Sequence, residues 1–161
     1  MNNAHVHLMV NHLPIAGLLI GILVLITGLV LKKTEVRLTG LGVFIFSAIA
    51  SVFAFYTGEG AEEVVENVAG ISETLIHAHE EYADSFFTLT LILGGISCII
   101  FITEVRKFSL SKYLVMLCLL VAIADGILAI YVGASGGEIR HTEIRGDAKM
   151  IPLENENDDE G

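Results

Sequence analysis

The chain has 161 residues, of which 53% are hydrophobic, and a formal net charge of −10 at pH 7. With a mean hydropathy of +0.70, it offers too little polar surface for an ordinary soluble domain, so the composition excludes that class. The negative charge argues against a nucleic-acid partner and against binding to anionic lipid.

Four stretches, residues 13–31, 38–57, 85–103 and 113–134, are nearly all apolar, and Asp125 is the one acidic or basic residue in them. Each is about 20 residues long, which is enough for an α-helix to cross a bilayer core of roughly 30 Å. We therefore predict an all-α, four-helix transmembrane bundle with helices at about 13–31, 38–57, 72–104 and 112–134. These helices form one membrane domain over residues 1–150, and residues 151–161 are expected to be an acidic, disordered tail.

Basic residues cluster in the connections after the first and third helices, as Lys32, Lys33, Arg37, Arg106, Lys107 and Lys112. The connection between them, residues 58–84, has eight acids and no Lys or Arg. The positive-inside rule places the two basic connections in the cytoplasm. Both termini are then expected outside, with the protein in the inner (plasma) membrane of a bacterium. The first helix lacks a basic n-region, so we expect it to be retained rather than cleaved.

The chain repeats short motifs at related positions. His5-Val6-His7 precedes the first helix, and His77-Ala78-His79 precedes the third, 72 residues later. The second helix ends in Ala54-Phe55-Tyr56-Thr57-Gly58, and the fourth ends in Ala129-Ile130-Tyr131-Val132-Gly133, 75 residues later. This pattern predicts two similar helical hairpins related by a pseudo-twofold axis along the membrane normal.

All six histidines fall in segments that the charge pattern puts on the outer side. Pro14 suits the first turn of a helix, which places His12 at or just before the start of the first helix. His77 shares one face of the third helix with Glu73, Glu80 and Asp84, whereas His79 points about 160° away. We expect His77, rather than His79, to face the bundle axis.

Glycine and acidic residues complete the expected outer mouth. Gly136 and Gly137 are expected to end the fourth helix, so that His141 folds back across the mouth as a further ligand or a solvated side chain. Glu59, Glu62, Glu63 and Glu66 recur at helical spacing, which suits either metal binding or a solvated acidic face. Asp125, inside the fourth helix, is expected to orient a ligand, relay a proton or bond to Ser51, Thr88 or Thr90.

These residues define two possible sites. The candidates for cofactor binding, haem included, are His12, His77 and His79. The candidate metal ligands are His5, His7, His12, His77, His141, Glu62, Glu66 and Glu80. Imidazole with carboxylate suits zinc, copper, iron or manganese, and two imidazoles suit haem b, so the sequence selects no single cofactor.

The run from His5 to Gly17, with His12-Leu13-Pro14-Ile15-Ala16-Gly17 at its end and a histidine opening the third helix, resembles an uncharacterised family of four-helix bacterial membrane proteins. The resemblance implies a histidine-rich bundle that binds haem or a metal, and it implies no particular activity. It covers mainly the first helix and the repeated hairpin plan. The stretches 59–66 and 136–141 have no counterpart in it.

We therefore expect an integral membrane protein with a transition-metal or haem site at the outer mouth, serving electron transfer or metal handling. The alternative is a cofactor-free structural subunit that anchors a partner through its acidic outer face. An enzyme is less favoured, because the chain has no HExxH motif, nucleophile elbow or phosphate loop. The expected partners are membrane lipid and other membrane or periplasmic subunits, and no nucleic acid.

Overall fold

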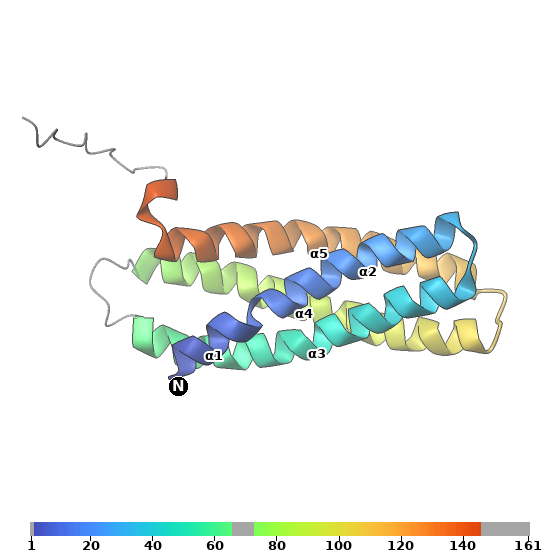
Figure 1. Ribbon diagram of the computed structural model, residues 1–161, viewed down its shortest axis with the longest axis horizontal. Helices are drawn as coiled ribbons and strands as arrows, with labels where there is room; N and C mark the ends of the chain where they lie inside the picture. Colours follow the sequence, from blue (N-terminus) through green and yellow to red (C-terminus); the bar gives the residue numbers. More distant parts are fainter. Residues whose placement is uncertain (1, 66–72, 146–161) are drawn as a thin grey trace, which may run out of the picture.

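The computed structural model describes residues 2–65 and 73–145. This part of the chain is an antiparallel helical bundle without strands (Figure 1). Its elements are α1 (Asn3–Val10), α2 (His12–Val30), α3 (Thr34–Val65), α4 (Glu73–Val105), α5 (Ser111–Arg140) and the short 3-10 helix η1 (Thr142–Ile144). Glu66 and the predicted tail 151–161 lie outside the described residues.

The predicted four-helix transmembrane fold is confirmed. Four spans are long and apolar enough to cross a membrane: Asn3–Val30, Thr34–Val64, Glu73–Val105 and Ser111–Arg140. The first span combines α1 and α2, which meet at Asn11. His12 is the first residue of α2, as expected, and Pro14 lies in its first turn, where the missing N–H leaves no hydrogen bond unmade.

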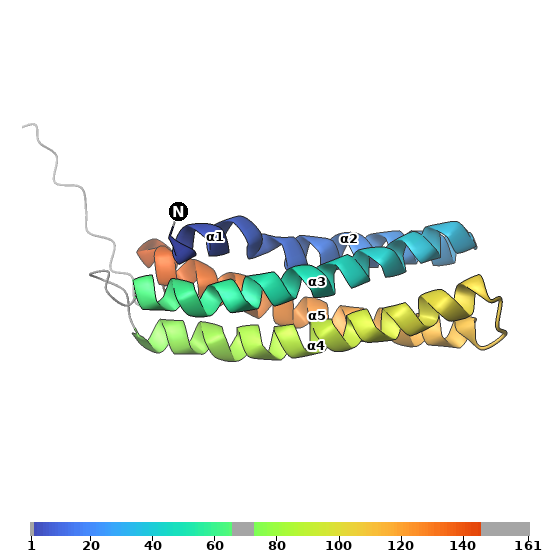
Figure 2. The same ribbon diagram turned by 90° about the horizontal axis from the view of Figure 1, so that it is seen from below.

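Consecutive helices are neighbours, and α2 also contacts α5, which closes the bundle. Figures 1 and 2 show α1, the end of α3, the start of α4 and the end of α5 gathered at one end of the molecule, here called the histidine end. The turns 31–33 and 106–110 lie at the opposite end, here called the basic end. The core between the helices is built from side chains such as Leu18, Leu25, Phe44, Leu93 and Val115.

Both turns at the basic end have the same backbone conformation and hydrogen-bond pattern. Lys32 and Lys107 have positive φ values of 54° and 57°. At the first turn, Lys33 N donates to Gly28 O and Lys32 N donates to Leu29 O. Phe108 N and Lys107 N make the equivalent bonds to Thr103 O and Glu104 O. This is the Schellman pattern, which satisfies the last carbonyl groups of a helix and reverses the chain.

Two helices are longer than the sequence indicated. The second transmembrane helix continues to Val65, and the fourth continues to Arg140. The expectation that Gly136 and Gly137 end the fourth helix is therefore wrong. A helical glycine costs only about 1 kcal/mol relative to alanine, and here both glycines make room for neighbours: a Cβ at Gly136 would lie 3.1 Å from His79 Cε1, and one at Gly137 would lie 3.3 Å from Ile144 Cδ1.

The two hairpins are similar in their pattern of burial. Buried positions of α2 recur 72 residues later in α4, pairing Pro14, Leu18, Gly21, Leu25 and Gly28 with Phe86, Thr90, Leu93, Ser97 and Ile100. Buried positions of α3 recur 78 residues later in α5, pairing Gly40, Phe44, Ser47 and Ser51 with Cys118, Ala122, Asp125 and Ala129. The second spacing is 78 rather than the expected 75, because the second hairpin has six more residues around its turn.

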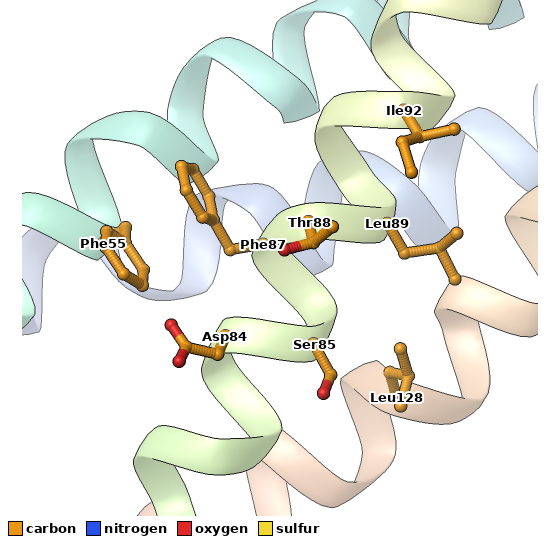
Figure 3. A pocket seen from close by; sticks show the side chains of 8 residues that line it. All are labelled: Phe55, Asp84, Ser85, Phe87, Thr88, Leu89, Ile92 and Leu128. Atoms are coloured by element: carbon orange, nitrogen blue, oxygen red, sulfur yellow. The ribbon is translucent and has the colours of Figure 1, made fainter.

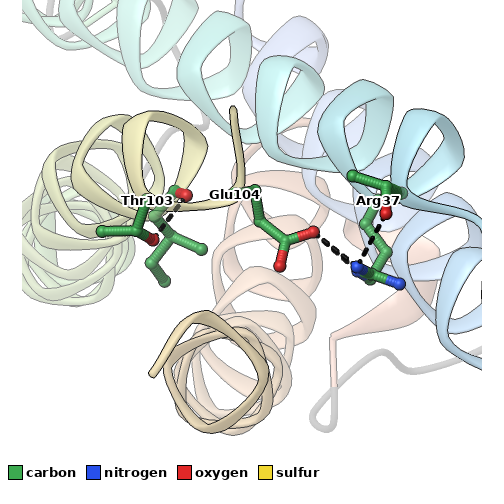
Figure 4. A network of polar contacts seen from close by, with 5 residues as sticks. Arg37, Thr103 and Glu104 are labelled. Carbon is green, nitrogen blue, oxygen red and sulfur yellow. Dashed lines mark hydrogen bonds and ion pairs between the residues drawn. The ribbon is translucent and has the colours of Figure 1, made fainter. Parts of the chain in front are cut away.

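An ion pair joins the hairpins near the basic end (Figure 4). Arg37 Nε and Nη2 donate to Glu104 Oε2 at 2.9 and 2.6 Å, and Nη2 also donates to Thr34 Oγ1 at 3.1 Å. The Glu104 side chain is 2% exposed. A carboxylate buried this deeply needs a charged partner, so this pair fixes α3 against α4. Sequence reasoning used Arg37 only as an orientation signal and did not single out Glu104.

We predict that Gly94→Ala destabilises the bundle by about 1–3 kcal/mol, because the new Cβ would meet the Cβ of Ala48 and force α3 and α4 apart. The matched control is Gly95→Ala, since a Cβ there meets open space. It should leave stability unchanged or raise it by up to about 1 kcal/mol, because alanine is the better helix former. Reversible unfolding in mixed SDS micelles measures both effects, and equal losses would contradict the α3–α4 contact.

Candidate functional site

Two imidazoles from different hairpins are hydrogen-bonded to the neighbouring helix of their own hairpin. His7, on α1, places Nδ1 3.1 Å from Ala54 O and 3.3 Å from Thr57 Oγ1, both on α3. His79, on α4, places Nδ1 3.0 Å from Ser135 Oγ on α5. Both side chains are half-buried. The same ring atom is therefore anchored in the same way in each hairpin.

The hydrogen-bond network favours one ring nitrogen of each histidine as the site of the proton. Thr57 Oγ1 donates its hydrogen to Phe53 O at 2.8 Å, and Ser135 Oγ donates to Val132 O at 3.2 Å. Each hydroxyl thus has a lone pair left to accept from a histidine, and Ala54 O is an acceptor only. Nδ1 of both rings is assigned as the N–H donor. In the neutral ring, Nε2 then carries the lone pair that binds a metal.

A glycine lies beside each ring. A Cβ at Gly58 would be 3.4 Å from His7 Cε1, and a Cβ at Gly136 would be 3.1 Å from His79 Cε1. Thr57-Gly58 and Ser135-Gly136 are 78 residues apart, the spacing that relates α3 to α5. Each hairpin therefore supplies one histidine, one hydroxyl and one glycine at equivalent positions.

The rings of His7 and His79 both lie at the histidine end, within range of electrostatic interaction with each other. Within the described residues, the backbone of α1 packs on α2 and α3 and does not pack on α4 or α5. His7 is therefore held on the α3 side of the histidine end, and His79 is held on the α5 side.

The expectation that His77 faces the bundle is wrong. The His77 side chain is 74% exposed, and its Nδ1 lies 3.2 Å from Glu80 Oε2 on the same helix. His79 lies seven and fourteen residues before the buried Phe86 and Leu93, so it continues their stripe along α4. This spacing is the signal that the sequence offered, and it outweighs the polar stripe through His77.

The other predicted histidines lie at the surface. His12 is exposed at the start of α2. His5 Nδ1 lies 3.2 Å from Asn2 Oδ1, and His141 Nδ1 lies 2.9 Å from Glu143 Oε1, in both cases between exposed groups. The mouth of the bundle is thus not covered by His141.

Two of the three predicted carboxylate ligands lie close together. The carboxyl groups of Glu62 and Glu80 lie within hydrogen-bonding reach of each other, close to His77. Across residues 2–65 and 73–145, however, no group of three or more His, Cys, Asp or Glu side chains is arranged to hold a metal ion. The expected set of imidazole and carboxylate ligands is therefore not assembled in the described part of the chain.

Asp125 is fully buried in the interior of the bundle. Its Oδ2 accepts a hydrogen bond of 2.8 Å from Thr90 Oγ1, one of the three predicted partners. Its Oδ1 has no partner among the described residues. Ser135 follows ten residues later on α5, about 15 Å along the helix, so Asp125 orients neither imidazole. Ser47 occupies the equivalent position in the first hairpin and donates to Pro14 O at 2.6 Å.

The chain was compared with protein-family models, with curated proteins and with solved structures, and no match was found. The chemistry of the site therefore rests on its own geometry. Sequence reasoning named His7 and His79 but missed Thr57 and Ser135, which hold them. Their signal was a hydroxyl residue followed by glycine at the same place in each hairpin.

We predict that Thr90→Val destabilises the protein by about 1–3 kcal/mol, because a buried carboxyl loses its hydrogen-bond donor. In an Asp125→Leu background the same substitution should cost little, since no polar group is left unsatisfied. Thr88→Val, at an exposed threonine on the same helix, is the control and should be neutral. A Thr90→Val cost that is equal in both backgrounds would show that the Thr90–Asp125 bond contributes nothing.

Proposed function

We propose that this protein is a membrane electron carrier that binds a b-type haem between His7 and His79. The observation that carries the proposal is the pair of half-buried imidazoles, one from each hairpin, each anchored through Nδ1 and each presenting Nε2. Ligand histidines in metalloproteins have this arrangement, in which the second ring nitrogen donates to a fixed oxygen.

The number of donors favours haem over a bare metal ion. A zinc site needs three or four protein ligands, whereas the porphyrin already supplies four nitrogens to its iron and needs only two axial ligands. The described residues contain the pair and no assembled group of three.

The surroundings are suited to an apolar macrocycle. At the histidine end, α3 and α4 bury Ala61, Ile76 and Phe86, which are 8%, 6% and 5% exposed. Ile76 precedes His79 by one helical turn, and Phe86 follows it by two. If haem were bound beside these side chains, they would limit the access of water to its iron and influence the reduction potential.

The chain's own groups would have distinct tasks. A bound haem would supply a one-electron couple of ferric and ferrous iron. Thr57 and Ser135 would hold the imidazole planes and, by accepting from Nδ1, make Nε2 a stronger donor to the metal. The basic turns favour an orientation with the histidine end outside the cytoplasm, which would place electron exchange at the periplasmic face of a bacterial inner membrane.

We predict that the detergent-purified protein, oxidised and then reduced with dithionite, has the sharp reduced bands of a six-coordinate b-type haem. His7→Ala and His79→Ala should each abolish or shift these bands, because one axial ligand is lost. His77→Ala and His12→Ala are the matched controls, since both side chains are exposed, and they should leave the spectrum unchanged.

Elemental analysis of the same samples separates the alternatives. Iron in equal amount to haem, lost in the His7 and His79 variants, supports the proposal. Stoichiometric zinc, copper or manganese without haem bands would favour metal handling. The absence of both, with every histidine variant folded normally, would overturn the proposal in favour of a cofactor-free subunit.

A further inference from the structure

A shallow groove lies along α4 (Figure 3). It has a volume of about 650 Å³ and is lined by side chains of α3, α4 and α5. None of the histidines lines it. It begins at Asp84, five residues after His79, or about 7.5 Å along the helix. The groove is therefore separate from the imidazole pair but close to it.

The end of the groove nearest the histidines is polar and rich in hydrogen-bond acceptors. It carries Asp84, Ser85 and Thr88, all exposed. An ionised Asp84 carboxylate can only accept hydrogen bonds. Ser85 Oγ already donates its hydrogen to Glu81 O at 3.0 Å, so its lone pairs remain to accept from a ligand. These groups favour a ligand head that donates hydrogen bonds.

The remainder of the groove is apolar and partly aromatic. The rings of Phe55 and Phe87 stack with centroids 4.3 Å apart and planes at 10°. Leu89 and Ile92 follow farther along α4, and Leu128 of α5 lies beside Ser85 (Figure 3). A flat ring at the polar end, followed by a long hydrocarbon chain, would match this order of side chains.

The charge of the region argues against a phospholipid head. The sequence has no Lys or Arg between Arg37 and Arg106, so no cation from α3 or α4 can pair with a phosphate here. Asp84 would also repel that phosphate. We propose that the groove binds an isoprenoid quinol, whose ring hydroxyls donate to Asp84 and Ser85 while its tail lies along Leu89 and Ile92.

The Asp84 carboxylate favours binding of the quinol over the quinone. A quinone presents carbonyl oxygens, which are acceptors only and cannot bond to a carboxylate. A quinol presents two hydroxyl donors. Binding of the quinol to the groove does not depend on the proposed function. Its role as a redox partner of a haem at His7 and His79 does rest on that proposed function.

The test is binding of a short-chain quinol, decyl-hydroquinone, and of the corresponding quinone to the full chain in detergent under anaerobic conditions, by calorimetric titration. We expect the quinol to bind at least about tenfold more tightly, the effect of one hydrogen bond to a charged group. Asp84→Asn should reduce this preference to less than about threefold, because an amide can also donate to a carbonyl.

The matched control is Glu81→Gln, which neutralises an exposed carboxylate on the same helix outside the groove. It should keep the tenfold preference. Ile92→Trp should block the apolar part and weaken both ligands. The His79→Ala variant should bind the quinol as the wild type does, so a failure of the haem proposal and a failure of this one give different results.

Equal affinity for quinol and quinone in the wild type would overturn the proposal. So would the same loss of preference in Glu81→Gln as in Asp84→Asn, or binding that never saturates and only follows partition into micelles. Displacement of the quinol by equimolar phosphatidylethanolamine would identify the groove as a phospholipid contact instead.

Discussion

The hydrocarbon core of a membrane offers no hydrogen bonds, and this constraint determines where polar groups can occur in the bundle. The helices satisfy their own backbones, and several buried polar side chains find a hydrogen-bond partner on a neighbouring helix. That happens at three levels: Arg37 with Glu104 between the hairpins, Thr90 with Asp125 inside the second hairpin, and each inward histidine with a hydroxyl of its own hairpin. The apolar packing between these levels sets helix spacing, and the polar pairs set rotation and register.

The two inward imidazoles stand on different supports. His79 belongs to a continuous helix of 33 residues and is held in the α4–α5 seam. His7 belongs to α1, which has eight residues, contains no buried residue and joins α2 at Asn11. α1 is fixed to the bundle by its contacts with α3, including Asn3 against Gly60. His79 is therefore held by a long helix within the bundle, whereas His7 is held by a short helix through its contacts with α3.

Sequence patterns predicted the features that depend on local composition. Apolar runs gave the four spans, Pro14 gave the start of α2, and the repeated histidine motif gave the paired hairpins. The rotation of α4 was not predicted correctly, because the polar stripe through His77 competed with the buried stripe through His79, and tertiary packing decided between them. The length of α5 was also missed, since Gly136 was taken as a helix end although its missing side chain accommodates an imidazole. The Arg37–Glu104 pair joins residues 67 positions apart, and no local pattern indicates such a pair.

The equivalence of the hairpins has a consequence for how such a site originates. Two hairpins of the same orientation with matching buried positions correspond to the two copies that a symmetric dimer of one hairpin would contain. In that dimer a single histidine, with its hydroxyl and glycine, would occur twice and face its own copy across the axis. Both imidazoles would thus come from one ancestral position. In a single chain each half could change alone, and the equivalent positions are Ser47 in one hairpin and Asp125 in the other.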